Sequence, residues 1–324
     1  MAVQAPKLFF RSPTRFSHSN HDKLHWVCAY SVMSSSAQVP VLAVISPAKS
    51  LRSAAECTSL PKHLTATRPA YLSKADALAA LVSKLKEAEI AKIMSISGAL
   101  ASGVVDMFAA FKASADEKQL RDQQAALLYN GPAYQGLSFE TLSKTECEKA
   151  QKSLRFLSGL YGLLKPCDAI QPYRLEMSIA PKSFGLNGVK SLAEHWADDI
   201  SLDINATLGS TPGAILLNIA SDEYSKAINT KVLSKNIKMV NVRFEDGGKV
   251  KSVYAKRARG LMARYVCRTS TSAGTISIDQ LKQFDLEGYA FSSRASASND
   301  SLLVFTRGVE EAKEASAKKK QKTS

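Results

Sequence analysis

The chain has 324 residues, of which 45% are hydrophobic, and carries a formal net charge of +14, so its length allows one large domain or two with full cores. The positive charge favours nucleic acid or another polyanion over an acidic protein surface as a partner. Five widely spaced cysteines without a C-x-x-C pair, and the lack of a long apolar run, argue against a disulfide framework, a zinc site and a membrane span. A soluble protein of a reducing compartment is expected.

Residues 1–38 differ in composition from the rest of the chain. They are rich in serine and contain a single acid, Asp22, beside four basic residues: Lys7, Arg11, Arg15 and Lys23. This composition resembles an organelle-targeting segment, which would place the protein in a plastid or a mitochondrion. The alternative is a dispensable or untranslated leader, with Met33 as the true start. Both interpretations exclude the segment from the fold.

A short apolar run, Val39–Ile45, predicts a buried strand that ends at Ser46-Pro47. The segments Lys74–Lys86 and Ala88–Lys112 are apolar at helical spacing, and glycines make the second helix breakable. Ala125–Tyr129 fits either a strand or the end of a helix.

The turn Asn130-Gly131-Pro132 separates these elements from a second group. Ser143–Leu157 has a helical pattern, and so does Lys190–Leu208. A second buried strand is predicted at Ala214–Ala220. It is followed by Ser221, whose hydroxyl is expected to cap a helix that begins with two acids.

Val240–Phe244 and Val250–Ala255 flank Asp246-Gly247-Gly248, a pattern that predicts a β-hairpin. A helix is expected at Arg257–Arg268 and a last strand at Leu302–Phe305. The sequence therefore predicts a mixed α/β fold in a single domain, residues 39–307. Residues 308–324 form a basic tail.

The run Leu154–Met177 contains Gly159 and Gly162, three residues apart, together with basic residues that include Lys165 and Arg174. Glycines allow backbone N–H groups to approach a phosphate, and the cations would neutralise its charge. A tight turn between buried segments explains the same pattern. The residues alone leave both interpretations open.

Three arginines, Arg257, Arg264 and Arg268, fall within about 40° of one another on the predicted helix, and Lys256 lies near its start. No acid within the helix pairs with them. Like charges in this arrangement repel unless an anion relieves them, which favours a binding surface. The alternative is a row of solvated surface arginines.

Two loops follow predicted strands and are candidates for a ligand site. Lys49 and Ser50 follow the first strand and could bind a phosphate, but the sequence lacks a phosphate-binding P-loop, and a solvated loop lysine is the simpler explanation of Lys49. Ser221 follows the second strand. His195, Asp198 and Asp199 share a helix face, yet no second cluster completes a metal site. Motifs of serine hydrolases, zinc proteases and dinucleotide-binding proteins are absent, and we predict no metal and no cofactor.

Six stretches, in order, identify a family resemblance. They are LAVISPAKSL at 42–51, YNGPAYQGL at 129–137, LRFLSGLYGLLKPCDAIQPYRLEM at 154–177, ILLNIASDEYSKAI at 215–228, SVYAKRARGLMARYV at 252–266 and FDLEGYAF at 284–291. Together they resemble the YaaA family of peroxide-stress proteins. The resemblance implies a mixed α/β (α+β) fold likened to a cantaloupe slice, in which helices flank a β-sheet, with a helix-hairpin-helix element and a positively charged cleft. It also implies a cytosolic protein that binds DNA and lowers free intracellular iron.

By this resemblance Leu157–Gly162 would be the hairpin of the helix-hairpin-helix element. The residues expected to contact DNA are Gly159, Tyr161, Gly162, Lys165, Arg174, Lys256, Arg257, Arg259 and Arg264. Further cleft candidates are Lys49, Ser221, Asp222 and Tyr224. The partner would be double-stranded DNA bound through its phosphates, and hence without sequence preference.

Two alternatives remain open at this stage. One is an enzyme that acts on nucleic acid or a nucleotide, in which Lys49 or Lys256 has a pKa lowered by a second cation and serves as nucleophile or base. The other is direct iron sequestration. The sequence does not predict the oligomeric state.

Overall fold

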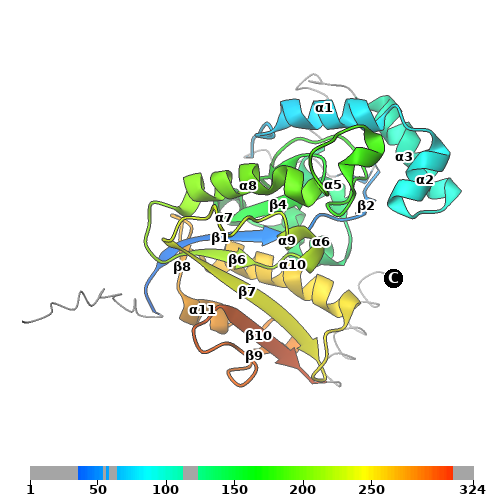
Figure 1. Ribbon diagram of the computed structural model, residues 1–324. Coiled ribbons are helices and arrows are strands. Elements are labelled where there is room, and N and C mark those ends of the chain that lie inside the picture. Colours follow the sequence, from blue (N-terminus) through cyan, green and yellow to red (C-terminus); the bar gives the residue numbers. More distant parts are fainter. Residues whose placement is uncertain (1–35, 54–55, 58–63, 112–122, 309–324) are drawn as a thin grey trace, which may run out of the picture. The chain divides into compact units, whose positions relative to one another are not determined.

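A computed structural model describes residues 36–53, 56–57, 64–111 and 123–308 (Figure 1). The predicted leader, residues 1–38, lies outside the described residues except for 36–38. The predicted tail, residues 308–324, lies outside them except for residue 308.

An eight-stranded sheet forms the centre of the fold, in the order β5-β4-β1-β6-β7-β10-β9, with β8 paired to the start of β1. Its strands are β1 (Val39–Ile45), β4 (Leu154–Ser158), β5 (Gly162–Leu164), β6 (Ala214–Asn218), β7 (Ile237–Asp246), β8 (Thr275–Ile276), β9 (Ala290–Phe291) and β10 (Leu302–Arg307). The strands β4, β1, β6, β7 and β10 run parallel. Because such strands are covered on both faces, β1 and β6 are nearly continuous apolar runs.

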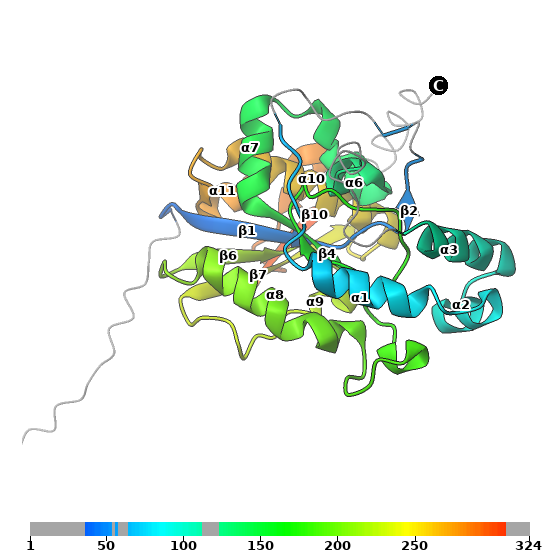
Figure 2. The same cartoon turned by 90° about the horizontal axis from the view of Figure 1, so that it is seen from above.

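Helices cover both faces of the sheet. The longest are α8 (Leu192–Leu208) and α10 (Ser252–Thr269), which lie on opposite faces in the two views (Figure 2). The others are α1 (Leu72–Val82), α2 (Glu87–Met94), α3 (Gly98–Ala110), α5 (Ala125–Leu128), α6 (Pro132–Leu137), α7 (Lys144–Ser153), α9 (Asp222–Ser225) and α11 (Ile278–Lys282), with short 3-10 turns at Phe139–Thr141, Pro181–Phe184 and Leu286–Gly288. A small sheet pairs β2 (Ser50–Leu51) with β3 (Tyr129–Asn130).

The predicted mixed α/β class is confirmed, and so are the strands expected at Val39–Ile45, Ala214–Ala220 and Leu302–Phe305. The helix expected at Ala88–Lys112 is two helices, α2 and α3. They separate at Ser95, which takes a left-handed conformation with φ of 51°. In the described part of the chain no single helix meets the length and hydropathy needed to cross a membrane, and only this pair, bent by 111°, meets them jointly.

The β-hairpin predicted around Asp246-Gly247-Gly248 is wrong. The chain turns at the two glycines, makes one bridge between Asp246 and Lys249, and enters α10 at Ser252. The neighbour of β7 is instead the parallel strand β10, which brings a much later segment to that position. Val250 and Val253 are 54% and 67% exposed, so the apolar residues that suggested a second strand are not part of the core.

The helix-hairpin-helix predicted at Leu157–Gly162 is also wrong. This segment is the turn of an antiparallel β-hairpin between β4 and β5, in which Ser158 pairs with Gly162. The helix predicted to reach Leu157 ends at Ser153. A Cβ atom at Gly159 would lie 2.2 Å from the Leu175 carbonyl oxygen, so the glycines serve close internal packing.

Candidate functional site

The carboxyl ends of β1, β4 and β6 meet at one edge of the sheet, which we call the carboxyl edge. Ligands of open α/β sheets commonly bind at such an edge. Two loops are joined there by Ser46, whose Oγ accepts a hydrogen bond of 2.8 Å from the Ser221 backbone N–H and lies 3.2 Å from the Ser221 Oγ. The Ser221 hydroxyl does not cap α9, contrary to prediction, because it is turned towards Ser46.

A buried carboxylate brings two of the predicted cleft residues together. Glu176 Oε1 lies 3.1 Å from Arg174 Nε and 3.5 Å from Lys49 Nζ. The Glu176 side chain is 8% exposed, whereas that of Lys49 is 60% exposed. The second carboxylate oxygen, Oε2, is buried and has no hydrogen-bond partner within the described ranges. Glu176 therefore has acceptor capacity that its neighbours do not use.

Buried tyrosines lie behind this carboxylate. The Tyr173 hydroxyl is 2.6 Å from the Tyr129 hydroxyl and 2.6 Å from Ser158 Oγ, while Tyr134 donates to the Ser46 carbonyl oxygen at 3.1 Å. Burial raises the pKa of Tyr173 to about 12 and those of Tyr129 and Tyr134 well above their ordinary value. These phenols stay protonated near neutral pH and can donate hydrogen bonds to a ligand or to one another.

The start of α10 adds positive charge to the carboxyl edge, because the helix begins directly after the end of β7. Its first turn contains no acid, and Lys251 and Lys256 are exposed. Arg259, one turn further, has its pKa lowered by burial, an effect that the negative charge of Asp222 opposes. A helix start with cations and no acid is suited to an anion.

The predicted ridge of unpaired arginines is wrong. Arg257 Nε donates to Glu287 at 2.8 Å, and Arg268 Nε donates to Glu146 at 3.0 Å. Arg264 Nη1 donates to the backbone oxygens of Leu137 and Ser138, at 2.8 and 2.9 Å. The acids and carbonyls come from other segments, so the helix sequence alone could not reveal them.

The other residues predicted to contact DNA or to line the cleft are either buried or lie away from the carboxyl edge. Tyr224 is buried near the tyrosine network, where burial and the neighbouring Tyr173 raise its pKa. Tyr161 is buried, and Gly159 and Gly162 are equally inaccessible in the β4–β5 turn. Lys165 is exposed, but it follows β5, which runs antiparallel to β4, and so it lies at the opposite edge of the sheet. The structure does not bring these four residues of the segment Leu154–Met177 to the carboxyl edge as surface groups.

The polar face of α8 is occupied by internal contacts. Asp199 accepts a hydrogen bond of 2.6 Å from Lys74, and Asp198 accepts one of 2.8 Å from Asn229. Burial lowers the pKa of His195, and Lys74 lowers it further. Among the described residues no three or more His, Cys, Asp or Glu side chains are grouped closely enough to hold a metal ion.

Comparison with known proteins identifies similar chains. A family model described as peroxide stress protein YaaA matches residues 41–295. A UPF0246 protein of Ralstonia nicotianae is 41% identical over 271 residues, which cover 82% of this chain and 99% of that protein. A UPF0246 protein of Idiomarina loihiensis is 38% identical over 272 residues, covering 82% and 98%. One of Burkholderia multivorans is 40% identical over 278 residues, covering 84% and 100%.

Proposed function

The chain belongs to the YaaA family of peroxide stress proteins, and from this premise we propose that it binds the phosphate backbone of duplex DNA at the carboxyl edge of its sheet. Protection of DNA and a lower level of free intracellular iron are the physiological consequences that we propose for this binding. The contacts are to phosphate, so binding does not depend on base sequence.

The start of α10 is the observation that carries this proposal. Its N-terminal N–H groups, its positive dipole end and the exposed Lys256 occur together without an acid in the first turn. Lys49 adds a second exposed ammonium group at the same edge. Positive side chains next to the positive end of a helix dipole repel it. The anionic backbone of DNA offsets this repulsion.

Reversing both charges, Lys49→Glu with Lys256→Glu, is expected to weaken duplex binding at least tenfold at moderate salt. Each lost phosphate contact removes about 0.9 from the slope of log K against log salt, so the slope falls by about 2. Fluorescence anisotropy with two duplexes of unrelated sequence, titrated with salt, measures both quantities.

The matched control is Lys231→Glu with Lys235→Glu, which makes the same change in net charge. Both lysines are exposed and precede β7, so they lie at the other edge of the sheet. An equal loss in this control, a flat salt response or a strong preference for one duplex sequence would contradict the proposal.

A thiol-based reaction with peroxide is not favoured by Cys147, Cys167 and Cys267, the three buried cysteines among the described residues. Burial raises the pKa of Cys147 to about 11 and that of Cys167 to about 12, and it raises that of the buried Cys267 further. Since the thiolate is the nucleophile, these three thiols are unreactive near neutral pH.

A second candidate function is catalysis on a nucleotide or nucleic acid, which the buried Glu176 favours. Its Oε1 contacts two cations, its Oε2 has no hydrogen-bond partner among the described residues, and its charge acts on the nearby Tyr173 hydroxyl, an arrangement suited to a base or to holding a polar substrate.

The variant Glu176→Gln separates the two functions because it keeps the shape and removes the charge. Under the binding function, the affinity for duplex DNA stays equal or rises, and no nucleic acid is altered by either protein. Under the catalytic function, the natural protein forms a product that chromatography and mass spectrometry detect, and the variant does not.

A further inference from the structure

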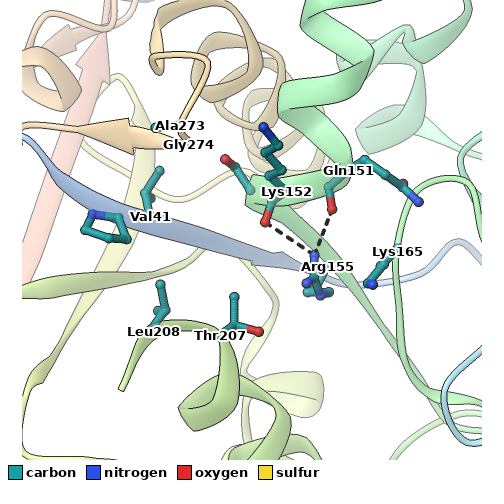
Figure 3. Close-up of a pocket in the computed structure, with 11 residues that line it drawn as sticks. Val41, Gln151, Lys152, Arg155, Lys165, Thr207, Leu208, Ala273 and Gly274 are labelled. Atoms are coloured by element: carbon teal, nitrogen blue, oxygen red, sulfur yellow. Dashed lines mark hydrogen bonds between the residues drawn. The ribbon is translucent and has the colours of Figure 1, made fainter. Parts of the chain in front are cut away.

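A second polar site lies at the edge of the sheet opposite the carboxyl edge, beside the start of β1 (Figure 3). It is a pocket of about 310 Å³. Its walls come from the first residues of β1, the end of α7 and start of β4, the residue after β5, the end of α8 and the loop before β8. Segments far apart in the sequence thus form one pocket. Its volume is in the lower range of small-molecule binding sites.

The pocket has a strongly positive lining. Arg155, Lys152 and Lys165 line it, and no Asp or Glu among the described residues does, although the charges of Asp203 and Asp168 act on Arg155. Arg155 is only 6% exposed, and its Nη1 group donates to the backbone oxygens of Leu154 and Gln151, at 2.8 and 3.2 Å. No acceptor within the described ranges pairs with Nε or Nη2. Part of a buried guanidinium therefore has unused donors.

A buried hydroxyl in the same wall also has no partner. Ser153 is fully buried, and its Oγ makes no hydrogen bond with any described residue. Buried polar atoms are nearly always paired, so this hydroxyl is an exception, but its oxygen is shielded from the open volume of the pocket. Ser153 adjoins Gly274, where an added Cβ atom would lie 3.1 Å from the hydroxyl oxygen.

The charge and shape of the lining select one class of ligand. A phosphate monoester carries close to two negative charges and three terminal oxygens, which suit a guanidinium together with an ammonium group. A carboxylate has one charge and two oxygens, so it matches these positive groups less well than a phosphate does. The other wall, with Val41 and Leu208, is apolar and can cover the organic part of an ester.

We propose that this pocket binds the phosphate group of a small organic phosphate ester. Arg155 and Lys165 neutralise the phosphate, and Val41 and Leu208 pack against the organic part. The site is independent of the proposed DNA contact, since the two lie at opposite ends of β1.

Calorimetric titration of the full chain with phenyl phosphate tests the proposal, with inorganic phosphate and benzoate as companion probes. We expect phenyl phosphate to bind more tightly than inorganic phosphate and benzoate not to bind measurably. Lys165→Ala is expected to weaken the binding of phenyl phosphate at least tenfold. Ala273→Trp, at an exposed position in the lining, is expected to abolish binding because it blocks the pocket.

The control variant Lys182→Ala removes an exposed lysine that does not line the pocket, and it should bind as the natural protein does. Thermal melting without ligand shows whether each variant is folded. Arg155 is left intact because it also binds the carbonyl groups at the end of α7. Undiminished binding in Lys165→Ala and Ala273→Trp would overturn the proposal.

A short DNA duplex added as a competitor distinguishes the source of the phosphate. The proposal expects the duplex not to displace phenyl phosphate, and expects Lys165→Ala to bind duplex normally. Displacement, together with weaker duplex binding by Lys165→Ala, would assign the pocket to nucleic-acid phosphate and overturn the assignment to a small ester.

Discussion

Replacing Arg307 with methionine is expected to lower the free energy of unfolding by about 3–5 kcal/mol, the cost of leaving a buried charge unpaired. Arg307 forms an ion pair with Asp246 between the neighbouring strands β10 and β7, and the two side chains are 3% and 0% exposed. The guanidinium also stacks 4.4 Å from the Tyr289 ring centroid, and Tyr289 donates to Asp246 at 3.1 Å. Methionine fills the volume but satisfies none of these groups.

Urea unfolding followed by circular dichroism measures the loss. The matched control is Arg243→Met, on β7, where the arginine pairs with Glu245 at 2.9 Å and is 43% exposed. Exposed pairs contribute at most about 1 kcal/mol. The double variant Arg307→Met with Asp246→Leu removes both charges and is expected to recover part of the loss. Similar losses for the two arginine variants would contradict the importance of burial.

The substitution Gly260→Ala is expected to cost about 3 kcal/mol, because it overpacks the tight contact between α10 and α6. A Cβ atom at Gly260 would lie 1.7 Å from the Ala133 carbonyl oxygen. On the facing helix, a Cβ atom at Gly136 would lie 2.4 Å from the Arg257 carbonyl oxygen. The helices touch through their backbones, so the methyl group can be accommodated only if α6 moves away.

Gly103→Ala provides the opposite case within the same protein. Gly103 is also in a helix, α3, but an added Cβ atom there meets nothing within 4 Å. This variant should gain about 0.5–1 kcal/mol, because alanine loses less backbone entropy on folding. Chemical unfolding of both variants should therefore give changes of opposite sign. A stable Gly260→Ala protein would mean that the two helices are less closely fixed than the structure indicates.

The elements that could be predicted from sequence are those with a strong local pattern. β1 and β6 are short apolar runs bounded by turn residues, and α8 has an uninterrupted helical period. The hairpin expected after β7 failed because Asp246-Gly247-Gly248 specifies a turn but not the element after it. The position beside β7 is decided by β10, a segment about sixty residues further along the chain.

The candidate site could also be predicted only in part, because its contacts join segments that are distant in sequence. Lys49 and Arg174 were recognisable as basic residues in suitable stretches, but the residue that joins them, Glu176, had no signal beyond its proximity in sequence to Arg174. Lys165 was misplaced because one β-hairpin reverses the chain and takes it to the far edge of the sheet. The partners of the α10 arginines, such as Glu287, lie on other segments. Local patterns identify residue chemistry, while tertiary contacts decide which residues are free to bind.

The central position of β1 affects how the chain is made. β1 is the first described strand in the sequence, yet it pairs with β4 and with β6, where Val44 is matched to Asn218. At about 5–20 residues per second, a ribosome takes roughly 10–35 s to proceed from β1 to the end of β6. β4 is made earlier than β6, so until β6 has emerged one side of this apolar strand has no partner, and we expect chaperones or transient burial to shield it.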